Sequence, residues 1–125
     1  MVKQHLVNFF KRRRFKKGMG IQKLWEILVP QNSNTGAAYS LEHHKAWDEK
    51  VRELSGGLTL LRTVKGQWIN PDGRTFIDTM IPVRIYCDEM SIDKIIAFTL
   101  THYNQEEILA YEISSNVKLV RRKNN

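Results

Sequence analysis

The stretch that decides the fold is GGLTLLRTVKGQWINPDGRTFIDTMIPVRIYCDEMSIDKIIAFTLTHYNQEEILAYEI, residues 56–113. Its apolar pattern predicts a strand over 58–69, interrupted near Lys65-Gly66, and a long strand over 75–87. Between them, Asn70–Gly73 has the composition of a hairpin turn. Its proline fixes φ, its aspartate can bond its own backbone, and its glycine accepts positive φ. The centre of this stretch therefore predicts a β-hairpin.

Two helices are predicted from their caps and their periodicity. Ser40 is a good N-cap for a helix that Gly56-Gly57 ends. Ser91 is the expected N-cap of a second helix over 92–103, which Asn104 ends. Both segments place apolar residues at helical spacing, so each helix has one face for a core.

Two further strands complete the fold. Residues 21–29 alternate in part and stop at Pro30, and residues 107–113 follow the second helix. The resulting order, β-α-β-β-α-β, is the ferredoxin-like arrangement. We therefore predict an α+β sandwich, with a four-stranded antiparallel sheet and both helices on one face.

The long strand at 75–87 has two chemically different faces. One face is expected to meet the helices; it comprises Ile77, Thr79, Ile81, Val83, Ile85 and Cys87. The other is expected to look outward; it comprises Phe76, Asp78, Met80, Pro82, Arg84 and Tyr86. Pro82 indicates an edge position or a bulge, because proline cannot donate to a ladder.

The formal net charge of +7 belongs to the ends of the chain. Residues 1–20 hold seven basic and no acidic side chains, and residues 118–125 hold four basic ones. Removing these eleven from twenty leaves 9 basic and 13 acidic groups in residues 21–117. We therefore divide the chain into a flexible basic extension (1–20), a ferredoxin-like domain (21–117) and a basic tail (118–125).

Several interpretations of the basic extension stay open. It can bind nucleic acid or anionic lipid, since each cation can neutralise a phosphate. The candidate nucleic-acid-binding residues are Lys11, Arg12, Arg13, Arg14, Lys16 and Lys17. Alternatively it is a solvated terminus, or residues 1–18 lie upstream of a natural start at Met19.

Other features narrow the class. The lone Cys87 cannot form an internal disulfide, which favours a reducing compartment and a cytoplasmic protein. No apolar run approaches the roughly 18 residues of a membrane span. His43 and His44 would point about 100° apart on a helix, which disfavours a shared metal. The chain has no Walker, GxGxxG or GxSxG motif. We therefore predict no metal and no cofactor.

The candidate site is a group of residues on the open face of the sheet. If Leu24, Glu26 and Leu28 face outward, they lie near Asp78, Arg84 and Tyr86 on one side. On the other side they then lie near Ile108, Ala110 and Glu112. The ligand-binding candidates are Glu26, Trp68, Arg84, Tyr86 and Glu112. Arg84 can form a cross-strand ion pair, or bind a carboxylate or phosphate. An uncovered, partly apolar sheet face also favours an oligomer interface.

The central segments resemble a known family. Gly57-Leu58-Thr59, Gly66-Gln67-Trp68, Pro71–Arg74 and the strand at 81–85 resemble small bacterial proteins of unknown function with a ferredoxin-like domain. Gln105-Glu106 stands where that family has a Gln-Glu pair before its final strand. The resemblance covers about half of the chain and implies the fold rather than an activity.

A weaker similarity is to phage S-adenosylmethionine lyases. Residues 83–88 and 105–114 resemble the VRVRCKD and EQDCVLVYKS segments of that group. This resemblance implies a trimer with active sites between subunits and a glutamate on the central hairpin. Residues 67–74 contain Asp72 and no glutamate, so the chain departs from the lyases at that position.

Taken together, the sequence predicts a small homo-oligomer, dimer or trimer, of bacterial or phage type. It is expected to bind a small molecule at a subunit interface or on the open sheet face. Two alternatives remain: an S-adenosylmethionine-lyase-like enzyme, and a nucleic-acid-binding or interaction module that uses the basic termini.

Overall fold

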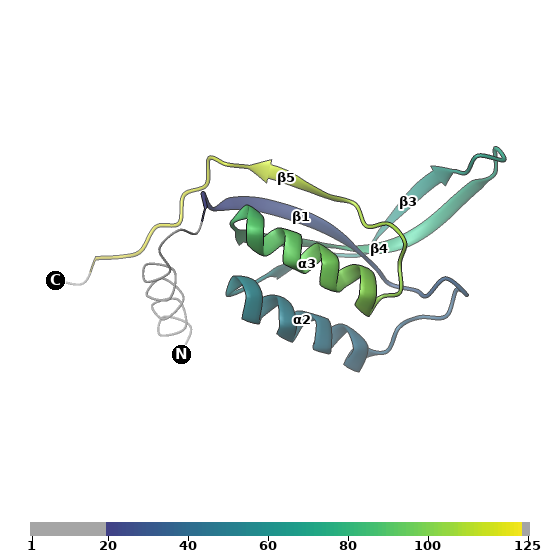
Figure 1. Cartoon of the computed structure of the whole chain (residues 1–125), viewed down its shortest axis with the longest axis horizontal. Helices are drawn as coiled ribbons and strands as arrows, with labels where there is room; N and C mark the ends of the chain where they lie inside the picture. The colour runs from purple at the N-terminus through teal and green to yellow at the C-terminus, as the bar shows by residue number, and fades with distance from the viewer. Residues whose placement is uncertain (1–19, 124–125) are drawn as a thin grey trace.

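The computed structural model describes residues 20–123, so the basic extension predicted at residues 1–20 lies outside them except for Gly20. The elements are β1 (Lys23–Pro30), α2 (Leu41–Ser55), β2 (Thr59–Leu60), β3 (Val64–Ile69), β4 (Thr75–Cys87), α3 (Glu89–His102) and β5 (Ala110–Ser114) (Figure 1). This is the predicted order, with the second predicted strand divided into β2 and β3. After β5 the chain has no helix or strand as far as Lys123.

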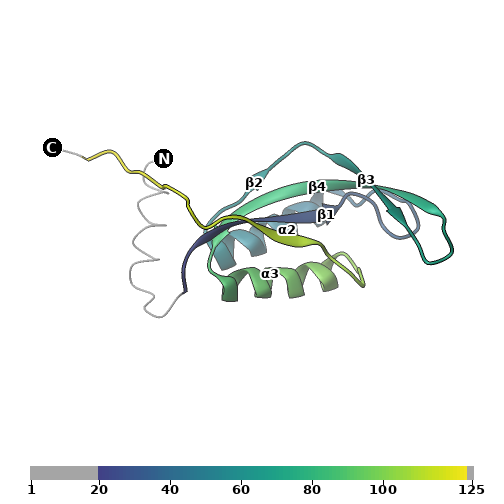
Figure 2. The same cartoon turned by 90° about the horizontal axis from the view of Figure 1, so that it is seen from above.

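The sheet is antiparallel and has the ferredoxin-like order β2-β4-β1-β5, with β3 also paired to β4. Both helices cover the same face, and the other face is open (Figure 2). The predicted fold class is therefore confirmed. Within residues 20–123, no helix is long and apolar enough to cross a membrane.

The core lies between the helices and the sheet. Its buried members come from β1, α2, β4, α3 and the C-cap of α3: Ile27, Val29, Trp47, Val51, Val83, Ile85, Cys87, Ile92, Ile95 and Tyr103. The inward-facing residues of β1 and β4 sit at alternate positions, as the period-2 pattern predicts. The indole N–H of Trp47 donates to Thr99 Oγ1 at 2.9 Å, so the polar atom of this buried ring is satisfied.

Local signals place most boundaries correctly. Ser40 accepts a hydrogen bond from the His43 N–H and caps α2, while Gly56 ends it at φ 90°. The predicted turn at Asn70–Gly73 joins β3 to β4. The predicted N-cap of α3 is wrong, because Asp88 caps the helix by accepting from the Ser91 N–H at 2.8 Å.

The expected interruption near Lys65-Gly66 is also misplaced. Both residues lie within the β3 ladder, and the strand breaks instead at residues 61–63. A Cβ on Gly66 would lie 2.5 Å from Met80 Cε and 3.1 Å from the Trp68 ring. A side chain at this position would therefore displace the flexible end of Met80 and crowd the Trp68 ring.

Pro82 does not mark an edge or a bulge. β4 is an interior strand, and its register with β1 is continuous through Pro82. The Pro82 carbonyl accepts from the Leu61 N–H at 3.0 Å, so the Pro82 nitrogen faces the same outer side. The break between β2 and β3 falls on that side, which explains why a residue without an N–H is tolerated.

The tip of the β3–β4 hairpin projects beyond the helices, and we call residues 64–78 the hairpin arm (Figures 1 and 2). At the arm's end, Gly73 has φ 79°, and Asn70 Oδ1 accepts from the Arg74 N–H at 2.8 Å. The arm is thus a well-formed hairpin that the helical layer does not cover.

Candidate functional site

One polar row crosses the open face of the sheet. Glu26 of β1 is the register partner of Arg84 on β4 and of Tyr111 on β5. Thr59 of β2 is in turn the register partner of Arg84. Three of these positions, Arg84, Glu26 and Tyr111, are joined by side-chain hydrogen bonds, and we call them the polar row.

Glu26 is the centre of the polar row. Glu26 is only 8% exposed, yet each of its carboxylate oxygens accepts a hydrogen bond. Arg84 Nε donates to Oε1 at 3.1 Å, and the Tyr111 hydroxyl donates to Oε2. A carboxylate that lies this deep is stabilised by such charge-assisted hydrogen bonds. Glu26 therefore holds Arg84 and Tyr111 in place.

The two donors differ in exposure and in electrostatics. The Arg84 side chain is 45% exposed, and it bonds to Glu26 through Nε. The far end of the guanidinium is thus available to a ligand. The hydrogen bond to Glu26, aided by burial, raises the pKa of Tyr111, so this hydroxyl stays protonated and donates.

Apolar side chains flank the polar row. On one side of the polar row, Leu24 pairs with Tyr86. On the other side, Leu28 pairs with Pro82. Pro82 is buried and the other three are half-buried. The open face therefore combines a fixed polar row with apolar surroundings, a composition typical of binding surfaces.

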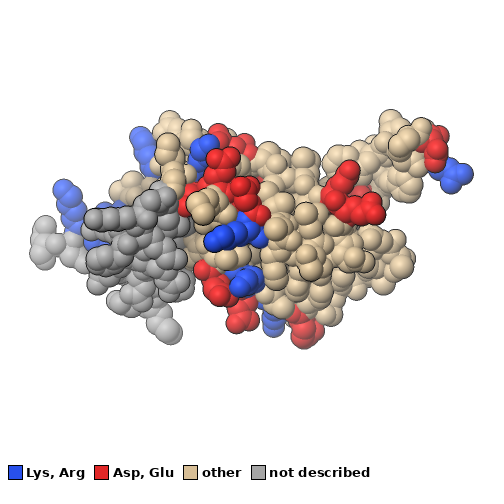
Figure 3. All heavy atoms as spheres, viewed as in Figure 1, with Lys and Arg blue, Asp and Glu red and all other residues tan. Residues whose placement is uncertain are grey.

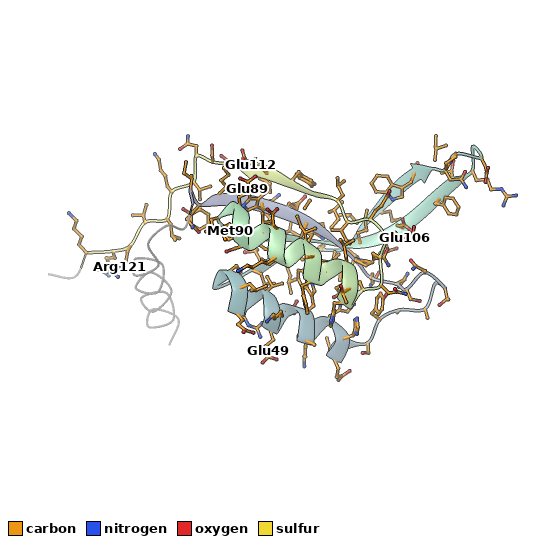
Figure 4. The ribbon with its side chains drawn as sticks, viewed as in Figure 1. Glu49, Glu89, Met90, Glu106, Glu112 and Arg121 are labelled. Atoms are coloured by element: carbon orange, nitrogen blue, oxygen red, sulfur yellow. The ribbon has the colours of Figure 1, made fainter. Side chains whose placement is uncertain are left out.

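The structure places the predicted site residue Glu112 elsewhere. Its register partner is Trp25, and it forms an ion pair with Lys23 at 2.9 Å. The charge of Glu89, at the start of α3, also acts on Lys23; Figure 4 labels both Glu89 and Glu112. The hydrogen bond and charge of Glu112 raise the pKa of Lys23. The prediction that Glu112 shares the outward face with Glu26 is thus wrong.

The predicted neighbours Ile108 and Ala110 also face the core, against which they pack. Tyr111 occupies the outward position as the register partner of Glu26, which the sequence pattern does not predict. The final segment, residues 107–113, has apolar residues at both alternations, so its pattern does not define a face.

Trp68 lies on the hairpin arm, opposite Phe76. Arg84 is eight residues farther along β4 than Phe76, which corresponds to about 26 Å at the rise of an extended strand. A small ligand cannot contact Trp68 and Arg84 of one subunit together. The structure therefore brings Glu26 and Arg84 together with Tyr86 nearby, and leaves Trp68 and Glu112 apart from them.

Charge on the described surface is mixed. Acidic and basic side chains are interspersed near the start of α3 on the face seen in Figure 3. The described residues contain no group of three or more His, Cys, Asp or Glu that could hold a metal ion. The predicted nucleic-acid-binding residues of the basic extension lie outside the described residues.

No protein-family model matches the chain, and no curated protein matches it in sequence. Solved structures do match its fold. A phage SAM lyase in complex with S-methyl-5'-thioadenosine has a TM-score of 0.60 at 12% identity, covering 82% of this chain and 88% of that one. The periplasmic divalent cation tolerance protein CutA from Archaeoglobus fulgidus has a TM-score of 0.59 at 12% identity, covering 78% and 87%.

CutA from Xylella fastidiosa is similar to the same degree, with a TM-score of 0.59 at 15% identity, covering 80% of this chain and 88% of that one. At these identities the similarity shows the fold alone. The protein is a small ferredoxin-like α+β protein. Its resemblance to bacterial proteins of unknown function rests on the quoted motifs, and its similarity to phage lyases extends to the fold.

Proposed function

We propose that the protein is a homo-oligomer that binds a small molecule where the open sheet face of one subunit meets the hairpin arm of another. The observation that carries this proposal is the distance between the polar row and Trp68. Two groups suited to one ligand, a guanidinium and a large aromatic ring, are about 26 Å apart in one chain by strand geometry. A second copy can bring them together.

The exposure of the hairpin arm supports the same proposal. Trp68 and Phe76, on one face, are 42% and 49% exposed. Ile69 and Ile77, on the other, are 76% and 63% exposed. A two-stranded hairpin is marginally stable alone, and contiguous apolar surface of this kind marks an interaction site. Because both faces are apolar, the arm is suited to lie between two surfaces of neighbouring subunits.

The polar row suggests the chemistry of the ligand. The exposed end of Arg84 is a planar fork that matches a carboxylate or phosphate. Tyr86 and an incoming Trp68 would supply aromatic surface for a flat or apolar portion. Glu26 would act by holding the Arg84 side chain in position. Glu112 remains a candidate at the rim of the sheet, near the start of α3.

A ligand screen tests the binding part of the proposal. We expect one or more nucleotides, S-adenosylmethionine or S-methyl-5'-thioadenosine to raise the melting temperature, since a ligand that binds only the folded state stabilises it. Arg84→Met should abolish the shift, while Lys23→Met, which removes a cation of β1 that pairs with Glu112, should retain it. A screen without any shift, or an unchanged shift in Arg84→Met, would contradict the proposal.

A second candidate is a lyase acting on S-adenosylmethionine, favoured by the fold of the phage enzyme. The lyase resemblance implies a hairpin glutamate, and residues 67–74 supply only Asp72. Asp78 is a further carboxylate at the base of the arm, where its register partner Gly66 has no side chain. Formation of S-methyl-5'-thioadenosine from S-adenosylmethionine, lost in Asp78→Asn, would support this activity. No product from the full chain would exclude it.

The third candidate, nucleic-acid binding, rests on the charge of the termini. Removing residues 1–18 should weaken binding to a short duplex, with a reduced salt dependence. Unchanged affinity would refute a role for the basic extension.

We also place the protein in the cytoplasm, because its only cysteine, Cys87, is buried and no disulfide within the chain is possible.

A further inference from the structure

Three histidines meet where α2 begins and α3 ends. His43 and His44 lie in the first turn of α2, and His102 is the last residue of α3. They are all the histidines of the described residues. None of them belongs to the polar row.

Four aromatic rings form a stacked column at this junction. The Tyr39 ring stacks on His43 with centroids 4.7 Å apart, and His43 stacks on His102 at 3.9 Å. Phe98 completes the column, 5.1 Å from His102. The column thus joins the loop before α2, the start of α2 and the last turn of α3.

His43 and His102 are also joined by two reciprocal hydrogen bonds. Nε2 of His43 lies 2.8 Å from the His102 carbonyl oxygen, and Nε2 of His102 lies 2.8 Å from the His43 carbonyl oxygen. A carbonyl oxygen only accepts, so each Nε2 carries a proton and donates. Both rings satisfy this arrangement when neutral. Protonating both would place two cations face to face at 3.9 Å, where like charges repel strongly.

His44 has a separate reason to stay neutral. Its Nδ1 lies 2.6 Å from the hydroxyl of Tyr103, a residue with no exposed surface. A neutral His44 can accept a hydrogen bond from the Tyr103 hydroxyl at Nδ1. A protonated His44 can only donate there, so the buried Tyr103 hydroxyl proton loses this acceptor. Burial lowers the pKa of His44, and the nearby His43 lowers it further, against the attraction of Asp48. Burial also raises the pKa of the Tyr103 hydroxyl.

These side chains connect two loops. The Tyr39 hydroxyl donates to the Tyr103 carbonyl at 2.6 Å. Asn34 Nδ2 donates to the Asn104 carbonyl at 3.1 Å, and Gln105 Nε2 donates to Asn34 Oδ1 at 3.2 Å. Residues 31–40 are thereby held against the connection between α3 and β5.

We propose that Tyr39, His43, His44, His102 and Tyr103 form a proton-operated clasp, the histidine clasp. At neutral pH it holds the loop at residues 31–40 against the end of α3, and at mildly acidic pH it releases this loop. The proposal is independent of the oligomer and of its ligand.

The charged groups around the histidine clasp do not offset this effect. Asp48 of α2 is the nearby acid, and Arg52 lies beside it in turn. Burial raises the pKa of Asp48, which weakens it as a counter-ion for a protonated His44 as pH falls. A lowered pKa of His44 in the closed form means that the closed form binds fewer protons than the open one. Its stability is therefore complete above the ordinary histidine pKa and is lost as pH falls below that value.

Amide hydrogen exchange on the full chain at pH 7.5 and pH 5.5, corrected for intrinsic rates, tests the proposal. We expect peptides covering residues 31–40 and 103–109 to exchange several-fold faster at the lower pH, while β4 stays protected. The variant His43→Gln/His44→Asn/His102→Gln should show no such difference. Its amides can replace the Nε2 donors and the Nδ1 acceptor, and they do not titrate. His5→Gln, which leaves the clasp intact, should behave like the wild type.

Equal pH dependence in the wild type and the triple variant would overturn the proposal, as would unchanged protection of both loops at pH 5.5. If the triple variant does not fold, a histidine NMR titration of the wild type decides. His44 must then titrate at lower pH than histidine in a short peptide. Titration at or above the peptide value would refute the clasp.

Discussion

The polar row gives a quantitative prediction, because Glu26 is far more buried than its partner Arg84. Replacing Arg84 by Met removes the cation and leaves the Glu26 carboxylate with the hydrogen bond from the Tyr111 hydroxyl. Breaking a buried ion pair from one side costs about 3–5 kcal/mol. The Arg84 side chain is 45% exposed, so screening reduces the expected loss to about 2 kcal/mol. For a domain of this size that loss lowers the melting temperature by about 8 °C.

The decisive variant is the double substitution Arg84→Met/Glu26→Gln. Because it also removes the charge that needs a partner, it should be more stable than Arg84→Met alone, with a coupling of at least about 1 kcal/mol. Thermal unfolding at one fixed protein concentration measures all variants. Lys23→Met is the matched control: it breaks the cross-strand pair with Glu112 at the surface and should leave the melting temperature unchanged. If the double variant were as unstable as the sum of the two single variants, the buried-carboxylate account would be refuted.

Three further predictions concern the scaffold. Asp88→Ala should lower the free energy of unfolding by about 0.5–2 kcal/mol, because the Ser91 N–H loses its acceptor. If the variant unfolds at the same denaturant midpoint as the wild type, Asp88 does not cap α3. Thr99→Val should cost about 1–3 kcal/mol, since the buried Trp47 N–H then lacks its acceptor, and calorimetry that finds no loss would contradict this pairing. Gly73→Ala should cost about 1 kcal/mol through its positive φ alone, because no atom lies within 4 Å of the added Cβ; a much larger loss in thermal unfolding would mean that the turn is packed.

Local signals were sufficient to predict the fold. Ser40 and Gly56 delimit α2, and the turn at Asn70–Gly73 fixes the hairpin that orders the sheet. Alternation in β1 and β4 also assigned Glu26 and Arg84 to the open face correctly. Each of these signals acts over a few residues, which is why they can be read without tertiary information.

The errors arise where two local solutions compete or where long-range register decides. Asp88 and Ser91 are both good N-caps, and the choice depends on where β4 ends. Tyr111 is not predicted because residues 107–113 have apolar side chains at both alternations, and only the pairing of β5 with β1 decides which set faces outward. The distance between Trp68 and Arg84 depends on the length and pairing of β4. The histidine clasp likewise joins residues about 60 positions apart in the chain, as the separation of 59 between His43 and His102 shows.

We propose above that the hairpin arm of one chain meets the open sheet face of another. Size-exclusion chromatography with light scattering on the full chain measures this assembly. We expect the mass of a dimer or trimer for the wild type, and of a single chain for Trp68→Ser/Phe76→Ser with its secondary structure intact. A wild type that remains a single chain at high micromolar concentration, or a double variant that assembles like the wild type, would refute assembly through the hairpin arm.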